Sequence, residues 1–205
     1  MKKYTLLKPL QIQETLNEAR IKFLTPDLFM RIFGISASKA KYYIESQTQT
    51  GLFIRLKKGL YTLKTSLPTE EEMANAIYKP SYLSFEYALA HYGLLPEMVY
   101  IITSATTKPT RLFQTQDMHF SFRTIKKQAY TGYVLKKTEK KSFLIAEPEK
   151  ALADYIYFLA QGKVADNDRL FSNVSKINKT KVLEYINLFD NKSTLDMYNK
   201  IYARS

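Results

Sequence analysis

The 205-residue sequence lacks cysteine altogether and has only two histidines, His91 and His119. The lack of cysteine excludes disulfides, thiolate zinc sites and cysteine nucleophiles, and two histidines leave little for a metal centre or a serine–histidine relay. Six glycines are spread through the chain without a GxGxxG or Walker pattern, so we expect no nucleotide-binding loop. These shortages predict a protein that is not an enzyme and has no catalytic site, metal site or cofactor.

Long apolar runs are also missing. No stretch reaches the roughly 18 apolar residues of a membrane span, and Met1 to Lys3 are followed by no apolar segment typical of a signal peptide. We therefore expect a cytoplasmic protein without a membrane partner. Hydrophobic residues still make up 45% of the chain, which is enough to build a buried core.

Acidic residues are too few to balance the basic ones, so the formal net charge is +12. Residues 1–66 hold 12 Lys and Arg against 4 Asp and Glu, and the first third of the chain therefore carries two thirds of the excess. A concentrated basic charge favours an anionic partner, most often nucleic acid and less often an acidic protein or a membrane surface.

Three helices are predicted in the basic segment. Helical spacing covers residues 10–20, Thr25 caps a short second helix over 26–34, and a third helix follows over 36–47. The apolar residues of the third helix share one face, which leaves a polar and cationic face opposite. The residues that we predict to contact DNA from this helix are Ser36, Ser38, Lys39, Lys41 and Tyr42.

A hairpin with a basic tip comes next, in the segment GLFIRLKKGLYTL at residues 51–63. The pattern predicts two short strands in which Leu52, Ile54 and Leu56 alternate with Phe53 and Arg55. Alone, such lysines could simply keep a sheet edge soluble. After three helices, the hairpin is typical of the wing of a winged helix-turn-helix, whose third helix enters the major groove while the wing neutralises phosphates. The wing residues that we predict to contact DNA are Arg55, Lys57, Lys58 and Tyr61.

A change of composition near residue 67 predicts a domain boundary, because Pro68 and three glutamates open a new helix there. We predict an α+β protein with a winged-helix domain over 1–66 and a mixed α/β domain over 67–205. The second domain should contain a small sheet of four or five strands. Its closing helices are predicted at about 166–173, 179–190 and 192–203.

Two other functions remain open from the residues alone. Asp117 followed by Glu139 and Lys141 resembles the way some metal-dependent nucleases arrange their acids and base. Glu139 lies in a Lys-rich hairpin turn, however, and such charge runs are usually solvated tips. A winged helix can also serve as a protein-interaction adaptor, although the basic tip of the hairpin argues against that use.

Five segments together resemble one family. They are FLTPDLFMRIFGIS, GLFIRLKKGLYTL, YLSFEYALAHYGLLPE, VYIITSA and AEPEKALADYIYFL, in this order over about residues 21–159. This succession is similar to that of the AbiEi-like antitoxins, which are transcriptional regulators of abortive-infection toxin–antitoxin operons. Its most specific pieces are a basic residue before Gly-x-Tyr at 58–61 and a Pro-Glu-Lys-Ala-Leu-x-Asp helix at 148–154.

The resemblance implies a cytoplasmic bacterial autorepressor. Its winged helix would bind double-stranded operator DNA, and its second domain would counter a partner toxin that resembles nucleotidyltransferases. The exposed side of the helix over 147–160 is then the candidate antitoxin surface, with Glu149, Lys150 and Asp154 as its residues. The alternative for this cluster is structural: acidic residues that stabilise the helix start, and an i,i+4 pair between Lys150 and Asp154.

Overall fold

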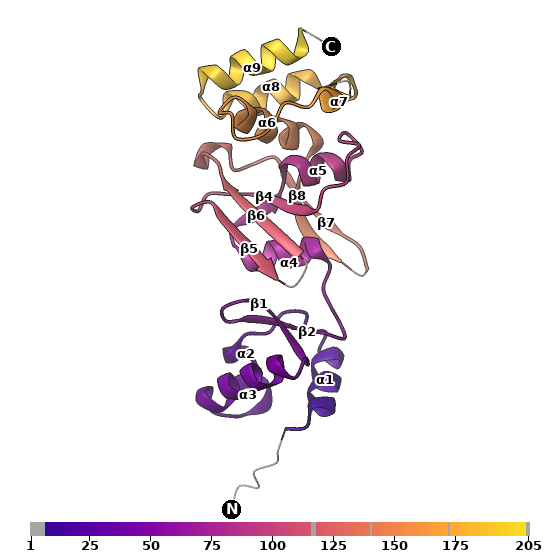
Figure 1. The fold of residues 1–205 in the computed structure, drawn as a ribbon, viewed down its shortest axis with the longest axis vertical. Helices are drawn as coiled ribbons and strands as arrows, with labels where there is room; N and C mark the ends of the chain where they lie inside the picture. The colour runs from indigo at the N-terminus through magenta and orange to yellow at the C-terminus, as the bar shows by residue number, and fades with distance from the viewer. Residues whose placement is uncertain (1–6, 116–117, 140, 172, 204–205) are drawn as a thin grey trace, which may run out of the picture. The chain divides into compact units, whose positions relative to one another are not determined.

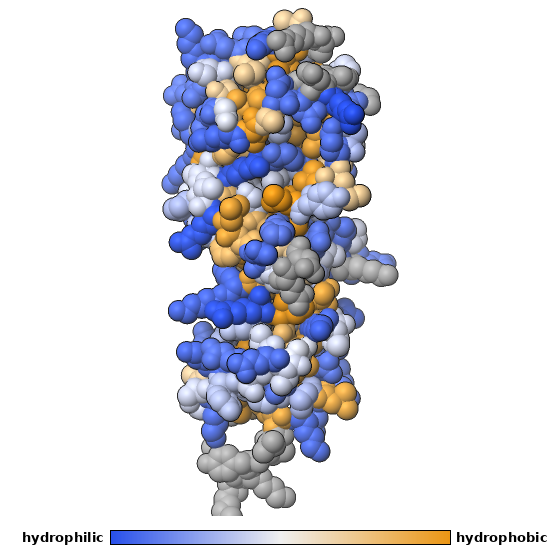
Figure 2. Space-filling view, viewed as in Figure 1, coloured by the Kyte–Doolittle hydropathy of each residue, from blue (hydrophilic) through white to orange (hydrophobic). Residues whose placement is uncertain are grey.

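The chain folds into two compact units, Met1–Thr69 and Glu70–Ser205 (Figure 1). Helices and sheets occur together, which confirms the α+β class. Hydrophilic residues cover much of the surface seen in Figure 2, with smaller hydrophobic areas between them. Within the described part of the chain, no helix is both long and apolar enough to cross a membrane. The computed structural model describes residues 7–115, 118–139, 141–171 and 173–203.

The first unit contains helices followed by a hairpin. In chain order its elements are α1 (Pro9–Glu18), α2 (Pro26–Phe33), α3 (Ala37–Gln49), β1 (Phe53–Lys57) and β2 (Leu60–Leu63). The second helix begins as predicted, because the Thr25 hydroxyl accepts a hydrogen bond from the Leu28 amide at 3.2 Å. It ends at Gly34, whose φ of 62° lies in the left-handed region that glycine adopts without strain.

The core of this unit joins all three helices to the hairpin. Phe29 lies at its centre and its ring contacts the rings of Phe33, Tyr43 and Phe53. The fully buried members of this cluster are Ile12, Leu16, Leu24, Phe29, Ala40, Ile44, Phe53, Tyr61 and Leu63.

The predicted alternation along the first strand is confirmed from Ile54 to Leu56, where Arg55 is exposed between two buried residues, but it was wrong at Leu52 and Phe53. Phe53 is buried in the core cluster, whereas Leu52 is only partly buried against it. Phe53 pairs with Leu63 across the hairpin, and the register shifts between Arg55 and Lys57. Phe53 and Ile54 are both buried although they are neighbours in the strand, so this stretch has no single inner face that a period of two could identify.

The second unit is built around a six-stranded sheet of order β5-β6-β4-β3-β8-β7. Phe122 and Arg123 are neighbours on β6 and point to opposite faces. Phe122 packs on Tyr78, just after α4 (Glu70–Ile77), with ring centroids 5.3 Å apart. Arg123 pairs with Glu86 of α5 (Phe85–His91). Helices α4 and α5 therefore cover different faces of the sheet (Figure 1). The strands are β3 (Ser81–Leu83), β4 (Ile101–Thr106), β5 (Arg111–Thr115), β6 (Met118–Thr124), β7 (Tyr133–Lys137) and β8 (Ser142–Ala146).

The sheet has more strands than the four or five predicted. Its central strand β3 is only three residues long, and the register pair that joins it to β8 is Leu83 with Ile145. Such a short, fully buried strand carries almost no periodicity of its own. The helices of this unit are α4 (Glu70–Ile77), α5 (Phe85–His91), α6 (Pro148–Leu159), α7 (Asp168–Phe171), α8 (Lys179–Asn187) and α9 (Lys192–Tyr202). Short 3-10 turns lie at Lys127–Ala129 and Val174–Lys176.

Candidate functional site

The first unit positions one helix, α3, with a mostly polar outer face. Gly34 closes α2, the Ile35 amide donates to the Met30 carbonyl at 3.3 Å, and α3 begins directly afterwards at Ala37. This tight turn holds α2 and α3 against each other through Phe29 and Tyr43, whose rings stack with centroids 5.6 Å apart. The helix α3 is therefore fixed to the core along one side only.

The sequence assigned the two faces of α3 correctly except at Ala37, which was placed on the apolar face and is exposed. Ala40 and Ile44 are completely buried in the core. Tyr42 is 76% exposed, an unusual position for an aromatic ring, which offers a large planar surface to a partner. The Ser36 and Ser38 hydroxyls lie 3.2 Å apart at the start of the helix. Every residue of α3 and its cap that we predicted to contact DNA is exposed, namely Ser36, Ser38, Lys39, Lys41 and Tyr42.

The three basic residues of the hairpin differ in their exposure to solvent. Arg55 and Lys58 are exposed, and Lys57 is partly exposed beside the register shift of β1. Gly59 completes the turn with a φ of 79°, a conformation that side-chain-bearing residues rarely adopt. The tip therefore carries positive charge that solvent or an anionic partner can reach.

Tyr61 does not belong to this surface, contrary to the sequence prediction. Its side chain is only 4% exposed and lies in the core cluster with Phe29 and Leu63. Its backbone also pairs with Leu24, because the Leu24 amide donates to the Tyr61 carbonyl at 2.8 Å and the Tyr61 amide donates back at 2.9 Å. This backbone pairing places the Leu24 segment against β2 and holds the Tyr61 ring in the core. Tyr43 is likewise held inward, since its hydroxyl donates to the Leu7 carbonyl at 3.0 Å.

The predicted surface on α6 is not a surface. Lys150 and Asp154 are both completely buried, and the Lys150 Nζ lies 2.5 Å from the Asp154 Oδ1. The i,i+4 pair between Lys150 and Asp154, which was one part of the structural alternative, is confirmed. Glu149 keeps some exposure and lies 3.7 Å from Lys181 of α8. The prediction failed because α6 is covered on more sides than an amphipathic helix, with α8 and α9 both packed on it.

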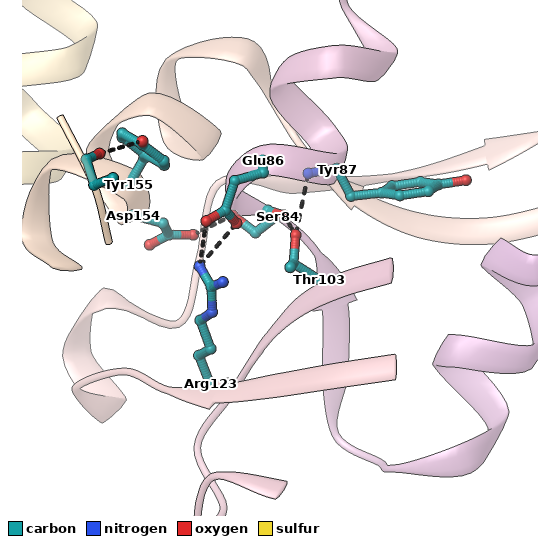
Figure 3. Close-up of polar contacts among 8 residues, drawn as sticks. Ser84, Glu86, Tyr87, Thr103, Arg123, Asp154 and Tyr155 are labelled. Atoms are coloured by element: carbon teal, nitrogen blue, oxygen red, sulfur yellow. Dashed lines mark hydrogen bonds and ion pairs between the residues drawn. The ribbon is translucent and has the colours of Figure 1, made fainter. Parts of the chain in front are cut away.

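The buried carboxylate of Asp154 joins three parts of the second unit, and Figure 3 shows its contact with Ser84. Its Oδ2 accepts hydrogen bonds from the Ser84 hydroxyl at 2.7 Å and from the Tyr82 hydroxyl at 3.1 Å. Burial raises the pKa of Asp154, while the Lys150 ammonium and the two hydroxyls oppose that rise. The Lys150 ammonium also lies 4.7 Å from the centre of the Phe189 ring. The cluster is saturated by its own members and is therefore suited to holding α6 on β3.

A second ion pair lies close to this cluster. Arg123 donates two hydrogen bonds to the Glu86 carboxylate, at 3.0 Å and 2.8 Å, and its guanidinium stacks 4.9 Å from the centre of the Phe85 ring (Figure 3). Phe85 itself has a φ of 58°, which is strained for an aromatic residue. The sequence did not reveal the pairs Ser84–Asp154 and Glu86–Arg123, because their members lie 70 and 37 positions apart in the chain and no local pattern connects them.

Of the three residues behind the nuclease alternative, the structure describes Glu139 and Lys141. Asp117 lies outside the described residues. Glu139 is exposed, and the Lys141 Nζ lies 3.0 Å from Glu71 of α4. Among the residues that the structure describes, no group of three or more histidine, aspartate or glutamate side chains could hold a metal ion.

No protein-family model matches the chain, and the search of curated proteins found no match.

Proposed function

We propose that this protein is a DNA-binding transcriptional regulator whose first unit is a winged helix-turn-helix. The observation that carries the proposal is the outer face of α3, where exposed serine, lysine and tyrosine side chains stand opposite the buried Ala40 and Ile44. In a winged helix the corresponding helix lies in the major groove, and its side chains read base edges. Arg55 and Lys58 at the hairpin tip support the same reading, since cations beside the groove neutralise phosphates.

The charge of the first unit agrees with this role. Twelve lysines and arginines stand against four acids over residues 1–69, whereas the remaining chain carries 19 against 15. An anionic partner should therefore prefer the first unit. Phosphate contacts position a regulator on DNA, while the contacts of α3 provide its sequence preference.

Selection of the full-length protein against a pool of random duplex DNA tests the proposal. We expect the bound fraction to converge on a short sequence motif, and the affinity for that motif to fall steeply as salt rises. Footprinting on the selected duplex should show protection of a major groove and of the backbone beside it. A pool that stays random, or binding that does not respond to salt, would exclude a sequence-reading regulator.

The antitoxin role rests on the resemblance to AbiEi-like antitoxins alone. We extend the proposal to a second unit that counters a partner toxin of the nucleotidyltransferase type. Co-expression of the full chain with a nucleotidyltransferase-like toxin from the same operon should restore growth. Growth that stays arrested, while the protein is folded and still binds its DNA, would leave a regulator without antitoxin activity.

A further inference from the structure

A cavity of about 400 Å³ opens in the second unit where two neighbouring strands separate. The strands β3 and β8 run parallel and are joined by the register pair Leu83–Ile145, and among the described residues their pairing extends no further. Ser81 and Ser142, at the ends of the strands beyond this pair, both line the cavity. The hollow therefore begins where the sheet ladder stops.

Side chains of α4 replace the missing strand partner of β8. The Leu144 amide donates to the Asn75 side-chain oxygen at 2.5 Å, and the Asn75 amide group donates to the Leu144 carbonyl at 3.4 Å. The Ser142 amide donates to the Glu72 carboxylate at 3.0 Å. Buried backbone groups need such partners, so the separation of the strands is a stable feature of the fold rather than an incomplete ladder.

The walls of the cavity are mainly aromatic and aliphatic. Tyr130 and Tyr133 have ring centroids 5.3 Å apart, and both rings contact the buried Tyr82, at 5.1 Å and 4.7 Å. Because the three rings pack on one another, their orientation is set before any ligand arrives. Leu135 of β7 also lines the cavity and is 60% exposed, so one wall is open to solvent.

Two polar groups distinguish this cavity from a simple packing defect. Ser81 is only 3% exposed, and its hydroxyl has no hydrogen-bond partner among the described residues. A buried hydroxyl without a partner is uncommon and costs free energy. Lys79 is exposed and also lines the cavity, whereas no acidic residue does so within the part of the chain that the structure describes. The site therefore attracts negative charge at its rim and planar apolar groups within.

We propose that this cavity binds a small planar aromatic carboxylate. The aromatic ring packs against Tyr130, Tyr133 and Leu135, where offset and edge contacts between rings are favourable. The carboxylate pairs with Lys79, and a polar atom of the ring system reaches the Ser81 hydroxyl after a small adjustment of that side chain. The volume lies within the range of about 300 to 1,000 Å³ that small-molecule sites occupy. This site does not depend on DNA binding by the first unit.

Titration of the full-length protein with indole-3-acetate, followed by calorimetry and by two-dimensional NMR, tests the proposal. A molecule of this size should bind with a millimolar dissociation constant and shift the amide signals of residues around the cavity. Tryptamine carries the same ring with a positive charge and should bind at least tenfold more weakly. Absence of binding by indole-3-acetate, or equal binding of both molecules, would overturn the proposal.

Two variants locate the site, each with a matched control. Leu135→Asp places a negative charge in the wall and should abolish binding, whereas Leu112→Asp on the exposed edge strand β5 should bind like the wild type. Lys79→Gln should weaken binding about two- to fivefold, as expected for an exposed ion pair, and Lys127→Gln should not. Lys79 is exposed, so this second variant remains informative even where Leu135→Asp disturbs the fold. Binding that survives both Leu135→Asp and Lys79→Gln would assign the ligand to another place.

Discussion

The Nζ of Lys150 lies 2.5 Å from the Oδ1 of Asp154, and neither side chain is exposed to solvent. The other oxygen of Asp154 accepts from Ser84 and Tyr82, so α6 is tied to β3 and to the start of α5 through one carboxylate. A fully buried ion pair is tolerated only because each charge is paired and hydrogen-bonded. The loss of one partner leaves the other charge buried without compensation, which destabilises the fold. Lys150 and Asp154, which the sequence analysis predicted to belong to a binding surface, therefore stabilise the interior of the second unit.

Removal of either charge alone should destabilise the protein severely. We expect Lys150→Ala and Asp154→Ala each to lower the free energy of unfolding by about 3 to 5 kcal/mol, because each leaves its partner buried and unpaired. The double variant Lys150→Ala with Asp154→Ala should lose less than the sum of the two single changes, because it leaves no unpaired buried charge. Denaturant unfolding of the four proteins measures this coupling. Additive losses, or a change of less than about 1 kcal/mol for a single variant, would contradict the structural role.

Two tyrosines of the first unit should behave in opposite ways. Tyr61→Ala removes a ring that is 4% exposed and should cost about 3 to 5 kcal/mol of stability, as truncation of a large core side chain does. Tyr42→Ala removes a ring that is 76% exposed and should change stability by less than about 0.5 kcal/mol.

DNA affinity distinguishes the two residues further. Tyr42→Ala should weaken binding to a selected duplex more than binding to random duplex, since it removes a contact to bases rather than to phosphates. Denaturant unfolding and fluorescence anisotropy on the two duplexes provide the measurements. If Tyr42→Ala weakened both duplexes equally, Tyr42 would contribute positioning and not readout.

Local signals in the sequence predicted the first unit well. Thr25, Pro26 and Gly34 define α2 by capping and backbone preference alone, and these effects act within a few residues. The division of α3 into a buried and an exposed face follows from a period of 3.6, which the sequence displays directly. The predicted contacts of Ser38, Lys41 and Tyr42 with DNA stay predictions, although their exposure fits them.

Burial set by distant segments could not be predicted in the same way. Tyr61 looks like an outward strand residue until Leu24 pairs with its backbone from 37 positions earlier in the chain. Lys150 and Asp154 are typical of a solvated helix face, because lysine and aspartate are almost never fully buried unless they are paired. Their burial depends on Tyr82 and Ser84, about 70 residues away, and on helices that follow α6.

The hairpin tip should contribute to the salt dependence of DNA binding. If Arg55, Lys57 and Lys58 each neutralise one phosphate, the triple change to alanine should reduce the slope of log affinity against log salt by roughly 2 to 3 units. A triple change of Lys179, Lys192 and Lys200, which are exposed on the second unit, provides a control with the same loss of charge. Equal slopes for both triple variants would remove the hairpin from the interface.

Acid should weaken the second unit through Glu147. The Tyr185 hydroxyl donates to the Glu147 carboxylate at 2.5 Å and the Lys181 Nζ lies 3.0 Å from it, and these contacts lower the pKa of Glu147 from its usual 4.5, the Tyr185 hydrogen bond most of all. A carboxyl group whose pKa is lower in the folded state binds its proton more tightly in the unfolded state. Its contribution to stability is therefore present above pH 4.5 and is lost as the pH falls through the lowered value.

The effect of Glu147 can be isolated by substitution. Between about pH 5 and pH 3, the free energy of unfolding of Glu147→Gln should fall less steeply than that of the wild type, because one linked proton has been removed. Tyr185→Phe removes the strongest of these contacts and should move the pKa of Glu147 back toward 4.5, which carboxyl NMR measures directly. Glu184→Gln changes an exposed residue of the same helix as Tyr185 and serves as the matched control. If Glu147→Gln and Glu184→Gln gave identical pH profiles, the hydrogen bonds to Glu147 would contribute nothing to acid stability.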